Sequence, residues 1–400
     1  MISDSLITRH LNNMSYANRT NHLKAEGAYA VLAKAQALEA DGQEIIHFEI
    51  GQPDFDTFSN ISKAGMDAIT AGKTRYTPPA GTPSFRQAIA MDASARRGVS
   101  ISPEQVVVGP GGKPHIFFPT LALVNPGDEV IYPNPGFPTY EAMIGVAGGI
   151  PVPVPLVEEN NFSFDLDVFD KLINEKTKLI IINSPSNPTG GIIRKEDLEH
   201  IAAAAKKYDC WVLSDEIYAR IVYDGMEDAP SIYALPGMAE RTVIMDGFSK
   251  TYAMTGWRLG YGIMPEELVR RVGLLLTHSV GSTAEFTQYA GTEALIGDQS
   301  QVDAVIAEYE RRRNAIVDGL NSLPGVSCQK PQGAFYVFPN IKGLGKTSDE
   351  VVNWFIEEAG VALLPGTSFG KFGEGYLRLS YANSIENIEK AIEKMAKIIK

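Results

Sequence analysis

Residues 242–260 read TVIMDGFSKTYAMTGWRLG, a short apolar run that gives way to a polar loop with three glycines. The run at 242–245 is too short for a typical helix, and its composition is typical of a strand buried on both faces of a sheet. Four further runs of this kind occur at 106–108, 128–132, 179–182 and 211–213. Helical patterns, such as those at 115–124 and 195–208, lie between runs. This alternation predicts an α/β fold with a mostly parallel central sheet flanked by helices.

A second pattern occupies the last quarter of the chain, where charged helices replace the buried runs. The elements expected there are a helix over 307–320, a strand at 335–338, a helix over 349–359, strands at 361–364 and 376–379, and a helix from 385. The segment before Gly51, with a helix over 29–40, is expected to pack on them. The 400 residues are therefore expected to form a large domain, 56–299, and a smaller α+β domain built from 1–55 and 300–400.

Composition and charge argue against several classes of protein. The two cysteines, Cys210 and Cys328, are far apart and form no Cys-x-x-Cys motif, so we expect neither a disulfide framework nor a metal site. The net charge of −12 disfavours nucleic acid as a partner. Residues 1–16 lack the apolar core of a signal peptide, and no run reaches the roughly 18 apolar residues of a membrane helix. We therefore expect a soluble, cytoplasmic protein.

A glycine-rich loop follows the first predicted strand of the large sheet. It reads Gly109-Pro110-Gly111-Gly112-Lys113 and precedes a predicted helix. Glycines allow a close approach of the backbone to a ligand, and a helix N-terminus offers free N–H groups, so the loop is consistent with a phosphate cradle. Its spacing matches neither the Walker loop nor the dinucleotide fingerprint, and an ordinary turn is the alternative interpretation.

Three further loops place polar groups at the ends of predicted strands, where ligands of open α/β sheets bind. The loop NSPSNPTG holds Asn187 in an extended conformation before a proline. Asp215 follows a buried strand and has Tyr218 three residues later; Asp215 is either a helix cap or a buried counter-ion. Lys250 lies with Arg258 in an aromatic-rich loop, where the alternatives are a solvated amine and a desolvated nucleophile.

Together these motifs resemble the class I aminotransferases of pyridoxal 5′-phosphate (PLP) fold type I, most closely the bacterial aspartate aminotransferase type. The segments that carry the resemblance span almost the whole chain in family order: 51–55, 76–81, 183–190, 214–218, 249–260 and 376–381. The resemblance implies the PLP-dependent transferase fold type I. It also implies an enzyme that moves the α-amino group of an amino acid, aspartate-like or related, to a 2-oxo acid such as 2-oxoglutarate.

The resemblance assigns the cofactor chemistry residue by residue. Lys250 would hold PLP as a Schiff base and would move a proton between the substrate Cα and the cofactor. Asp215 would pair with the pyridine nitrogen and favour its protonated form. Tyr218 and Asn187 would hydrogen-bond the phenolic oxygen. Phe137 would stack on the pyridine ring, although a role as a core phenylalanine is equally compatible with the sequence.

The resemblance also implies which residues bind the cofactor phosphate. They are Gly111, Gly112, Lys113, Ser249 and Arg258. Tyr76 would reach the same phosphate from a second subunit, which implies a homodimer with shared active sites. Gly247 stands where the family often has a phosphate-binding serine, and Ser249 is the candidate to replace it.

The substrate is expected to be bound through its carboxylates. Arg378 would pair in a bidentate manner with the α-carboxylate, assisted by the Gly51 N–H and by Asn187. Lys113 matches a lysine that reads the distal carboxylate in some relatives of the aspartate type, which favours a dicarboxylic substrate.

Three departures from the family pattern leave the reaction open. His278 and Glu285 lie in a segment that lines the partner's site in the family. They are solvated helix-end residues, groups that recognise a cationic or hydroxylated side chain, or an extra acid or base. Phe58 replaces the usual proline near the expected mouth of the site. The alternative function is therefore a PLP-dependent lyase or cyclase that performs elimination or ring closure on a modified amino acid. The intact cofactor residues argue against a third alternative, a non-catalytic relative.

Overall fold

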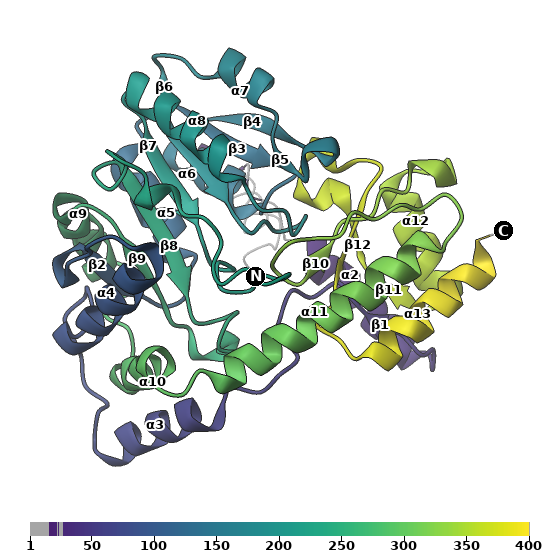
Figure 1. Ribbon diagram of the computed structural model, residues 1–400, viewed down its shortest axis with the longest axis horizontal. Coiled ribbons are helices and arrows are strands. Elements are labelled where there is room, and N and C mark those ends of the chain that lie inside the picture. Colours follow the sequence, from purple (N-terminus) through teal and green to yellow (C-terminus); the bar gives the residue numbers. More distant parts are fainter. Residues whose placement is uncertain (1–15, 22, 24–26, 400) are drawn as a thin grey trace, which may run out of the picture.

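The computed structural model describes residues 16–21, 23 and 27–399 (Figure 1). Its strands form one eight-stranded sheet, one three-stranded sheet and one two-stranded sheet. Figure 1 shows the large sheet with its helices on one side of the molecule and the small sheets on the other, beside the last helices of the chain. The segment 1–15, on which the prediction of no signal peptide depends, lies outside the described residues.

The large sheet contains all five runs that were expected as strands in this part of the chain. Its strands are β2 (Val106–Gly109), β3 (Glu129–Asn134), β4 (Ile150–Val157), β5 (Ser163–Phe164), β6 (Thr177–Asn183), β7 (Trp211–Asp215), β8 (Thr242–Gly247) and β9 (Gly260–Ile263). They lie in the order β2-β9-β8-β7-β6-β3-β4-β5. The five strands from β8 to β4 are parallel neighbours, whereas β9 runs antiparallel to β2 and β8, and β5 runs antiparallel to β4. The predicted α/β class with a mostly parallel sheet is confirmed.

Helices cover both faces of this sheet, as the unbroken apolar runs predict. The helices of this part are α3 (Ser59–Thr70), α4 (Pro83–Arg97), α5 (Pro114–Leu123), α6 (Thr139–Ala147), α7 (Leu166–Leu172), α8 (Lys195–Lys207), α9 (Glu266–Thr277) and α10 (Glu285–Ile296). Successive side chains of a strand point to opposite faces. In β6, Leu179 belongs to one core cluster with Ile116 of α5, and its neighbour Ile180 belongs to another with Ile201 of α8. Burial of each such side chain stabilises the fold by about 1.5–3 kcal/mol.

The small sheets join the beginning of the chain to its end. Their elements are α2 (Gly27–Ala40), β1 (Ile46–His47), α11 (Ser300–Asn321), β10 (Tyr336–Val337), α12 (Ser348–Trp354), β11 (Val361–Ala362), β12 (Leu364–Pro365), β13 (Leu377–Ser380) and α13 (Ile385–Ile398). β1 pairs in parallel with β11, and β13 lies between β10 and β12 in antiparallel pairing. The division into domains 1–55 with 300–400 and 56–299 stays a prediction.

Three strands of the large sheet, β4, β5 and β9, were not expected from the sequence. β4 reads IPVPVPLV, and prolines at every second position remove N–H donors from one edge of the strand only. β4 can carry them because β5 pairs only with Leu156 and Val157, so most of the outer edge of β4 needs no donors. β9 reads GYGI, whose two glycines hide its strand character in the sequence.

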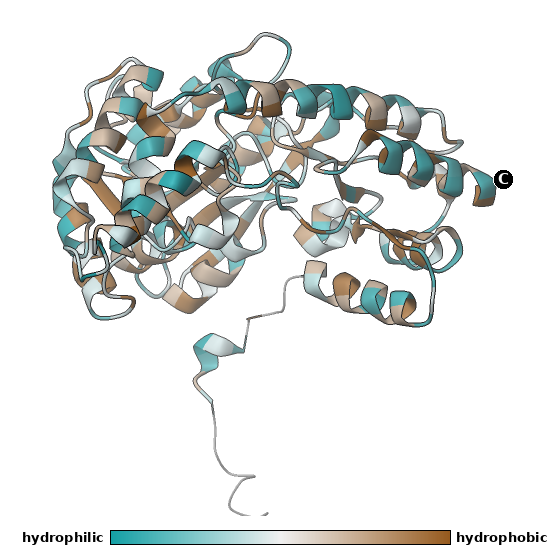
Figure 2. Ribbon diagram, turned by 90° about the horizontal axis from the view of Figure 1, so that it is seen from below, coloured by the Kyte–Doolittle hydropathy of each residue, from teal (hydrophilic) through white to brown (hydrophobic). Residues whose placement is uncertain are grey.

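Hydropathy follows the layers of the fold. Figure 2 shows hydrophobic residues along the strands of the large sheet and hydrophilic residues along exposed helix turns, including those of the C-terminal helix. Among the helices of the described part of the chain, none has both the length and the apolar character that a membrane crossing requires.

Candidate active site

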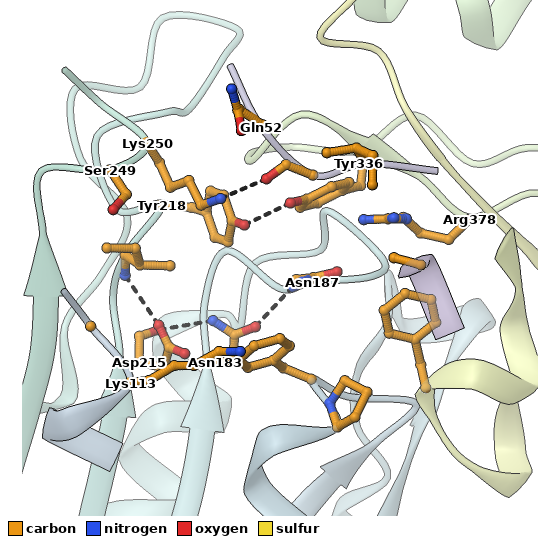
Figure 3. Close-up of a pocket in the computed structure, with 18 of the residues that line it drawn as sticks. Gln52, Lys113, Asn183, Asn187, Asp215, Tyr218, Ser249, Lys250, Tyr336 and Arg378 are labelled. Carbon is orange, nitrogen blue, oxygen red and sulfur yellow. Dashed lines mark hydrogen bonds between the residues drawn. The ribbon is translucent and has the colours of Figure 1, made fainter. Parts of the chain in front are cut away.

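A cavity of about 750 Å³ opens where the carboxyl ends of the parallel strands face the small sheets. Its walls combine loops that follow β2, β6, β7 and β8 with Arg378 of β13, Tyr336 of β10 and the start of α2. Figure 3 shows the side chains of Lys113, Lys250 and Arg378 arranged around this space. The position agrees with the rule that ligands of open α/β sheets bind beyond the carboxyl ends of the strands.

Lys250 was predicted from the sequence to be a site residue, and it lines the cavity. Its Nζ donates a hydrogen bond to the Gly51 carbonyl oxygen over 2.6 Å. Burial, followed by the nearby charges of Arg378 and Arg258, lowers the pKa of Lys250 to about 8. The lysine is therefore a desolvated amine, as the second interpretation of the sequence proposes.

Asp215 ends β7 and is 3% exposed. No α-helix begins at the turn that follows it, so it is not a helix cap. Its Oδ2 accepts a hydrogen bond from the Tyr140 hydroxyl over 2.6 Å, and its Oδ1 accepts one from the Ile217 N–H over 3.2 Å. Burial raises the pKa of Asp215 to about 7, while these two donors act in the opposite direction. Asp215 is therefore a buried carboxyl group, and the sequence did not predict its hydrogen bond from Tyr140.

Tyr218 contacts a residue that sequence reasoning missed. The Tyr218 hydroxyl lies 2.8 Å from the Tyr336 hydroxyl, and Figure 3 shows the two rings approaching from opposite sides of the cavity. Tyr336 also approaches Gly51 so closely that a Cβ there would lie 2.3 Å from its hydroxyl oxygen. The only signal in the sequence was the aromatic strand predicted at 335–338, which gives no hint of a site residue.

Asn187 is held beside the cavity by another unpredicted residue, Asn183. The Asn183 side chain donates to the Asp215 carbonyl oxygen over 3.0 Å and accepts from the Asn187 N–H over 2.8 Å. The Asn187 Oδ1 atom is buried and has no hydrogen-bond partner among the residues described. A buried amide oxygen without a partner costs free energy, so this atom is available to a ligand or to water.

The glycine loop after β2 lies against Arg258. Gly111 has φ +93°, and a Cβ there would lie 2.3 Å from Arg258 Nη2, so only glycine suits this position. Arg258 Nη1 donates to the Thr255 carbonyl oxygen over 2.9 Å. The loop leads into α5, and Gly112, Lys113 and Ile116 at this junction line the cavity.

The walls next to this loop carry a cation and an aromatic ring. Lys113 Nζ lies 5.4 Å from the centroid of the Phe137 ring, and both residues line the cavity. Phe137 is therefore a wall residue and not only a core residue. Ser249 also lines the cavity, whereas Gly247 lies within β8 and has no side chain to contribute.

Arg378 is buried and not an exposed edge charge, because β13 is the central strand of its sheet. Its guanidinium lies 4.7 Å from the centroid of the Tyr336 ring and 5.3 Å from that of Phe369. It also donates a hydrogen bond to the Glu49 carbonyl oxygen. The two rings fix the plane of the guanidinium, as bidentate binding of a carboxylate requires.

Four residues singled out in the sequence lie outside the cavity of this chain. Tyr76 is 98% exposed on the loop between α3 and α4, and His278 is an exposed residue at the end of α9. Glu285 accepts a hydrogen bond from the Arg75 N–H over 3.1 Å at the start of α10. Phe58 is buried in a hydrophobic cluster and does not line the cavity of this chain.

The comparisons with known proteins agree on one family. The family model "Aminotransferase class I and II" matches residues 43–395. An aromatic-amino-acid aminotransferase 2 of Thermococcus litoralis is 41% identical over 369 residues, which cover 92% of this chain and 93% of the relative. An aspartate aminotransferase of Pyrococcus abyssi is 40% identical over 366 residues, with coverage of 91% and 94%.

The solved structures agree with the sequence relatives. The structure of aspartate aminotransferase from Thermus thermophilus with maleate has a TM-score of 0.91 and 36% identity, and the match covers 96% of this chain and 99% of that chain. The predicted PLP-dependent transferase fold type I is thereby confirmed. The chain belongs to the aminotransferase class I and II family and is an aminotransferase.

Proposed function

We propose that the chain transfers the α-amino group of an aspartate-like amino acid to a 2-oxo acid such as 2-oxoglutarate, with PLP bound to Lys250. The observation that carries this proposal is the surroundings of the Lys250 amine. The amine is buried, its pKa is lowered to about 8, and it lies in a cavity bordered by Asp215 and Arg378. A cavity of about 750 Å³ has room for a cofactor and a small amino acid together.

The residues present fit this cofactor. The unpartnered Asn187 amide oxygen, the glycine loop beside Arg258 and the excess of cations over anions in the cavity all suit a phosphorylated, oxygen-rich ligand. When bound, PLP supplies an electron sink that stabilises negative charge at the substrate Cα. Asp215 would accept the proton of the pyridine nitrogen in a hydrogen bond, and Tyr218 with Asn187 would bind the phenolic oxygen.

The phosphate of the cofactor would be bound by a second set of groups. These are the backbone groups of Gly111, Gly112 and Lys113 and the side chains of Ser249 and Arg258. Phe137 would pack against the pyridine ring from the wall that it shares with Lys113. A helix N-terminus beside a guanidinium is a favourable environment for a phosphate dianion.

Lys250 would carry the proton of the reaction. A pKa of about 8 leaves roughly a tenth of the amine without its proton at pH 7, far more than an ordinary lysine, and this form of Nζ is both a nucleophile and a proton acceptor. The hydrogen bond to the Gly51 carbonyl oxygen holds Nζ on the side of the cavity where Arg378 lies. The free Nζ amine would take the proton from the substrate Cα and return it later in the reaction.

Carboxylates of the substrate would be recognised by two cations. Arg378 would bind the α-carboxylate, with the Gly51 N–H and Asn187 beside it. Lys113 would bind a distal carboxylate, which favours aspartate and glutamate as donors. The presence of maleate, a dicarboxylate, with the Thermus thermophilus relative supports this assignment.

The alternative of a lyase or cyclase receives less support. It depended on His278 and Glu285 as recognition groups, and these residues lie outside the cavity of this chain, in the segment expected to face the partner's site. The relatives carry aminotransferase names. Transamination is therefore the function that the site supports best.

A homodimer would complete the site, because Tyr76 is too exposed to act within its own chain. Exposed apolar side chains on α3 and α10, which pack side by side in Figure 1, would form part of the interface. His278 would then face the partner's site. A cytoplasmic location stays a prediction.

The test is a coupled assay on the purified, PLP-loaded protein. Aspartate and 2-oxoglutarate should yield glutamate and oxaloacetate in equal amounts, with phenylalanine as an alternative donor. Lys250→Ala should lose both this turnover and the visible absorbance of the Lys250-bound cofactor. Release of ammonia without formation of glutamate would instead favour the lyase.

A further inference from the structure

A pair of tyrosine hydroxyls joins the large sheet to the small sheets inside the cavity. Tyr218 follows β7 of the large sheet, and Tyr336 belongs to β10 of the three-stranded sheet. Their hydroxyl oxygens are 2.8 Å apart, and their rings meet edge to face at 83° with centroids 5.6 Å apart. Phe335 packs against the Tyr218 ring at 87°, so the Tyr218 ring has little freedom to move.

The two hydroxyls share one hydrogen bond but carry two protons. Burial raises the pKa of Tyr218 and that of Tyr336, so both remain protonated at neutral pH. One hydroxyl therefore donates to the other, and the proton of the accepting hydroxyl points elsewhere. If Tyr218 uses its proton to bind a ligand in the cavity, Tyr336 must be the donor.

The surroundings of Tyr336 favour this direction. The Arg378 guanidinium lies over the Tyr336 ring at 4.7 Å from the centroid, and a nearby cation makes a phenol a better donor and a poorer acceptor. Gly51 allows the hydroxyl to reach Tyr218, because any Cβ there would collide with it. Both residues are buried, so water does not compete for the bond.

We propose that Tyr336 is a positioning residue: its hydroxyl donates to Tyr218 and thereby directs the Tyr218 proton into the cavity, toward the phenolic oxygen of the cofactor. This inference rests on the proposed function, because it requires PLP on Lys250. Hydrogen bonds in series polarise one another, so donation by Tyr336 strengthens Tyr218 as a donor. A stronger donor stabilises the negative phenolic oxygen, and the Lys250 nitrogen bonded to the cofactor then loses its proton at a lower pH.

The test is a titration of visible absorbance against pH in the PLP-loaded protein, which reports the pKa of that Lys250 nitrogen. Tyr336→Phe keeps the ring over Arg378 and removes only the hydroxyl. We expect this pKa to rise by about 0.5–1 unit, the equivalent of one ordinary hydrogen bond. In a Tyr218→Phe background the same substitution should cause no further rise, because the hydroxyl through which it acts is gone.

Tyr309→Phe is the matched control. Tyr309 is also fully buried, its ring lies 5.3 Å from that of Phe335, and its hydroxyl has no hydrogen-bond partner within the described part of the chain. Its titration should match that of the wild-type protein. If Tyr336→Phe does not fold, Gly51→Ala, which must displace the Tyr336 hydroxyl, should raise the same pKa.

Three results would overturn the role of Tyr336: an unchanged titration in Tyr336→Phe, an equal rise in the Tyr218→Phe background, or an equal rise in Tyr309→Phe. Each of these leaves the proposed function intact, because the visible band is present. A wild-type protein that develops no visible band with PLP at any pH would instead remove the proposed function itself.

Discussion

The hydroxyl of Tyr140, in α6, donates a hydrogen bond to Oδ2 of Asp215, at the end of β7, over 2.6 Å. Both side chains are fully buried, and the bond stabilises the ionised form of a carboxyl whose pKa burial raises to about 7. In the proposed function, Asp215 would have to be ionised to hold a protonated pyridine nitrogen. Tyr140 would therefore support the charge that the cofactor needs, without lying next to Asp215 in the sequence.

Tyr140→Phe is expected to weaken PLP binding and to lower kcat. A hydrogen bond to a charged group contributes about 1.5–3 kcal/mol, so each quantity should change by roughly 10- to 100-fold near neutral pH. The loss should shrink at higher pH, where Asp215 ionises without help. The measurements are the PLP dissociation constant and kcat between pH 6 and 9. Tyr132→Phe, which loses a hydrogen bond to Glu141 outside the cavity, is the control.

Asp215→Asn is expected to stabilise the cofactor-free protein, and more so at alkaline pH. The unfolded chain ionises Asp215 near its ordinary pKa of 3.8, whereas the folded chain retains the proton up to about pH 7. Between these values the folded state binds more protons, so this group lowers the free energy of unfolding as the pH rises. Thermal unfolding at pH 5 and pH 8 should show the larger gain in Tm at pH 8. A larger gain at pH 5 would contradict the raised pKa.

Gly111→Ala is expected to reduce PLP affinity by displacing Arg258. The added Cβ would lie 2.3 Å from Arg258 Nη2, and φ +93° adds backbone strain. Gly72→Ala is the matched control, because Gly72 also has a positive φ, +74°, but nothing lies within 4 Å of its Cβ position. Both variants should lose about 1 kcal/mol of stability, whereas only Gly111→Ala should lose affinity for PLP and for inorganic phosphate. Equal PLP affinities in the two variants would argue against the phosphate role of the loop.

Arg378→Lys is expected to lower kcat/KM for the amino donor by at least about 100-fold, because an ammonium cannot form the two parallel hydrogen bonds of a guanidinium. The visible absorbance of bound PLP should persist, since Arg378 faces the substrate side of the cavity. Steady-state kinetics with aspartate and a spectrum of the loaded protein measure the two effects. Unchanged kcat/KM would assign the α-carboxylate to another cation.

Ile69→Lys is expected to dissociate the proposed homodimer. Ile69 of α3 is 50% exposed and Ile296 of α10 is 67% exposed, on helices that pack together. A charge buried at a dimer interface destabilises it, and the monomer would lose the contribution of Tyr76 to the partner's site. Sedimentation velocity should give a monomer with reduced PLP affinity. Phe372→Lys, at an apolar position that is 40% exposed and lies outside α3 and α10, should leave the mass unchanged.

Much of the fold was predictable, because buried parallel strands leave unbroken apolar runs in the sequence. The five apolar runs that were expected as strands of the large sheet are β2, β3, β6, β7 and β8. β4 and β9 were missed because proline and glycine are rare inside strands, and only the pairing pattern of the sheet explains why they are tolerated here. β5 was missed because it has only two residues. The gathering of Lys250, Asp215 and Asn187 at one cavity was likewise predictable, since these residues follow strand ends in recognisable motifs, whereas their roles toward PLP stay predictions.

Residues that act through contacts across the fold were not predictable from the sequence. Tyr140 and Tyr336 hydrogen-bond to partners 75 and 118 positions away, and nothing in their local sequence distinguishes them from core residues. Asn183 begins the motif 183–190, but its bond to a partner 32 positions away was not predicted. The same limit applies to Phe58, whose burial in a core cluster depends on how α3 packs. The location of Tyr76 relative to a second subunit remains a prediction.

The two sides of the cavity come from different sheets, and this arrangement bears on how the family diversifies. Lys250, Asp215 and Tyr218 depend on the large sheet, whereas Arg378 and Tyr336 depend on the three-stranded sheet. Substitutions in α2 or β12 would therefore reshape the substrate side of the proposed site without altering Lys250, Asp215 or Tyr218. Relatives of this chain carry both aspartate and aromatic aminotransferase names, and this division between the two sheets offers a structural basis for that breadth.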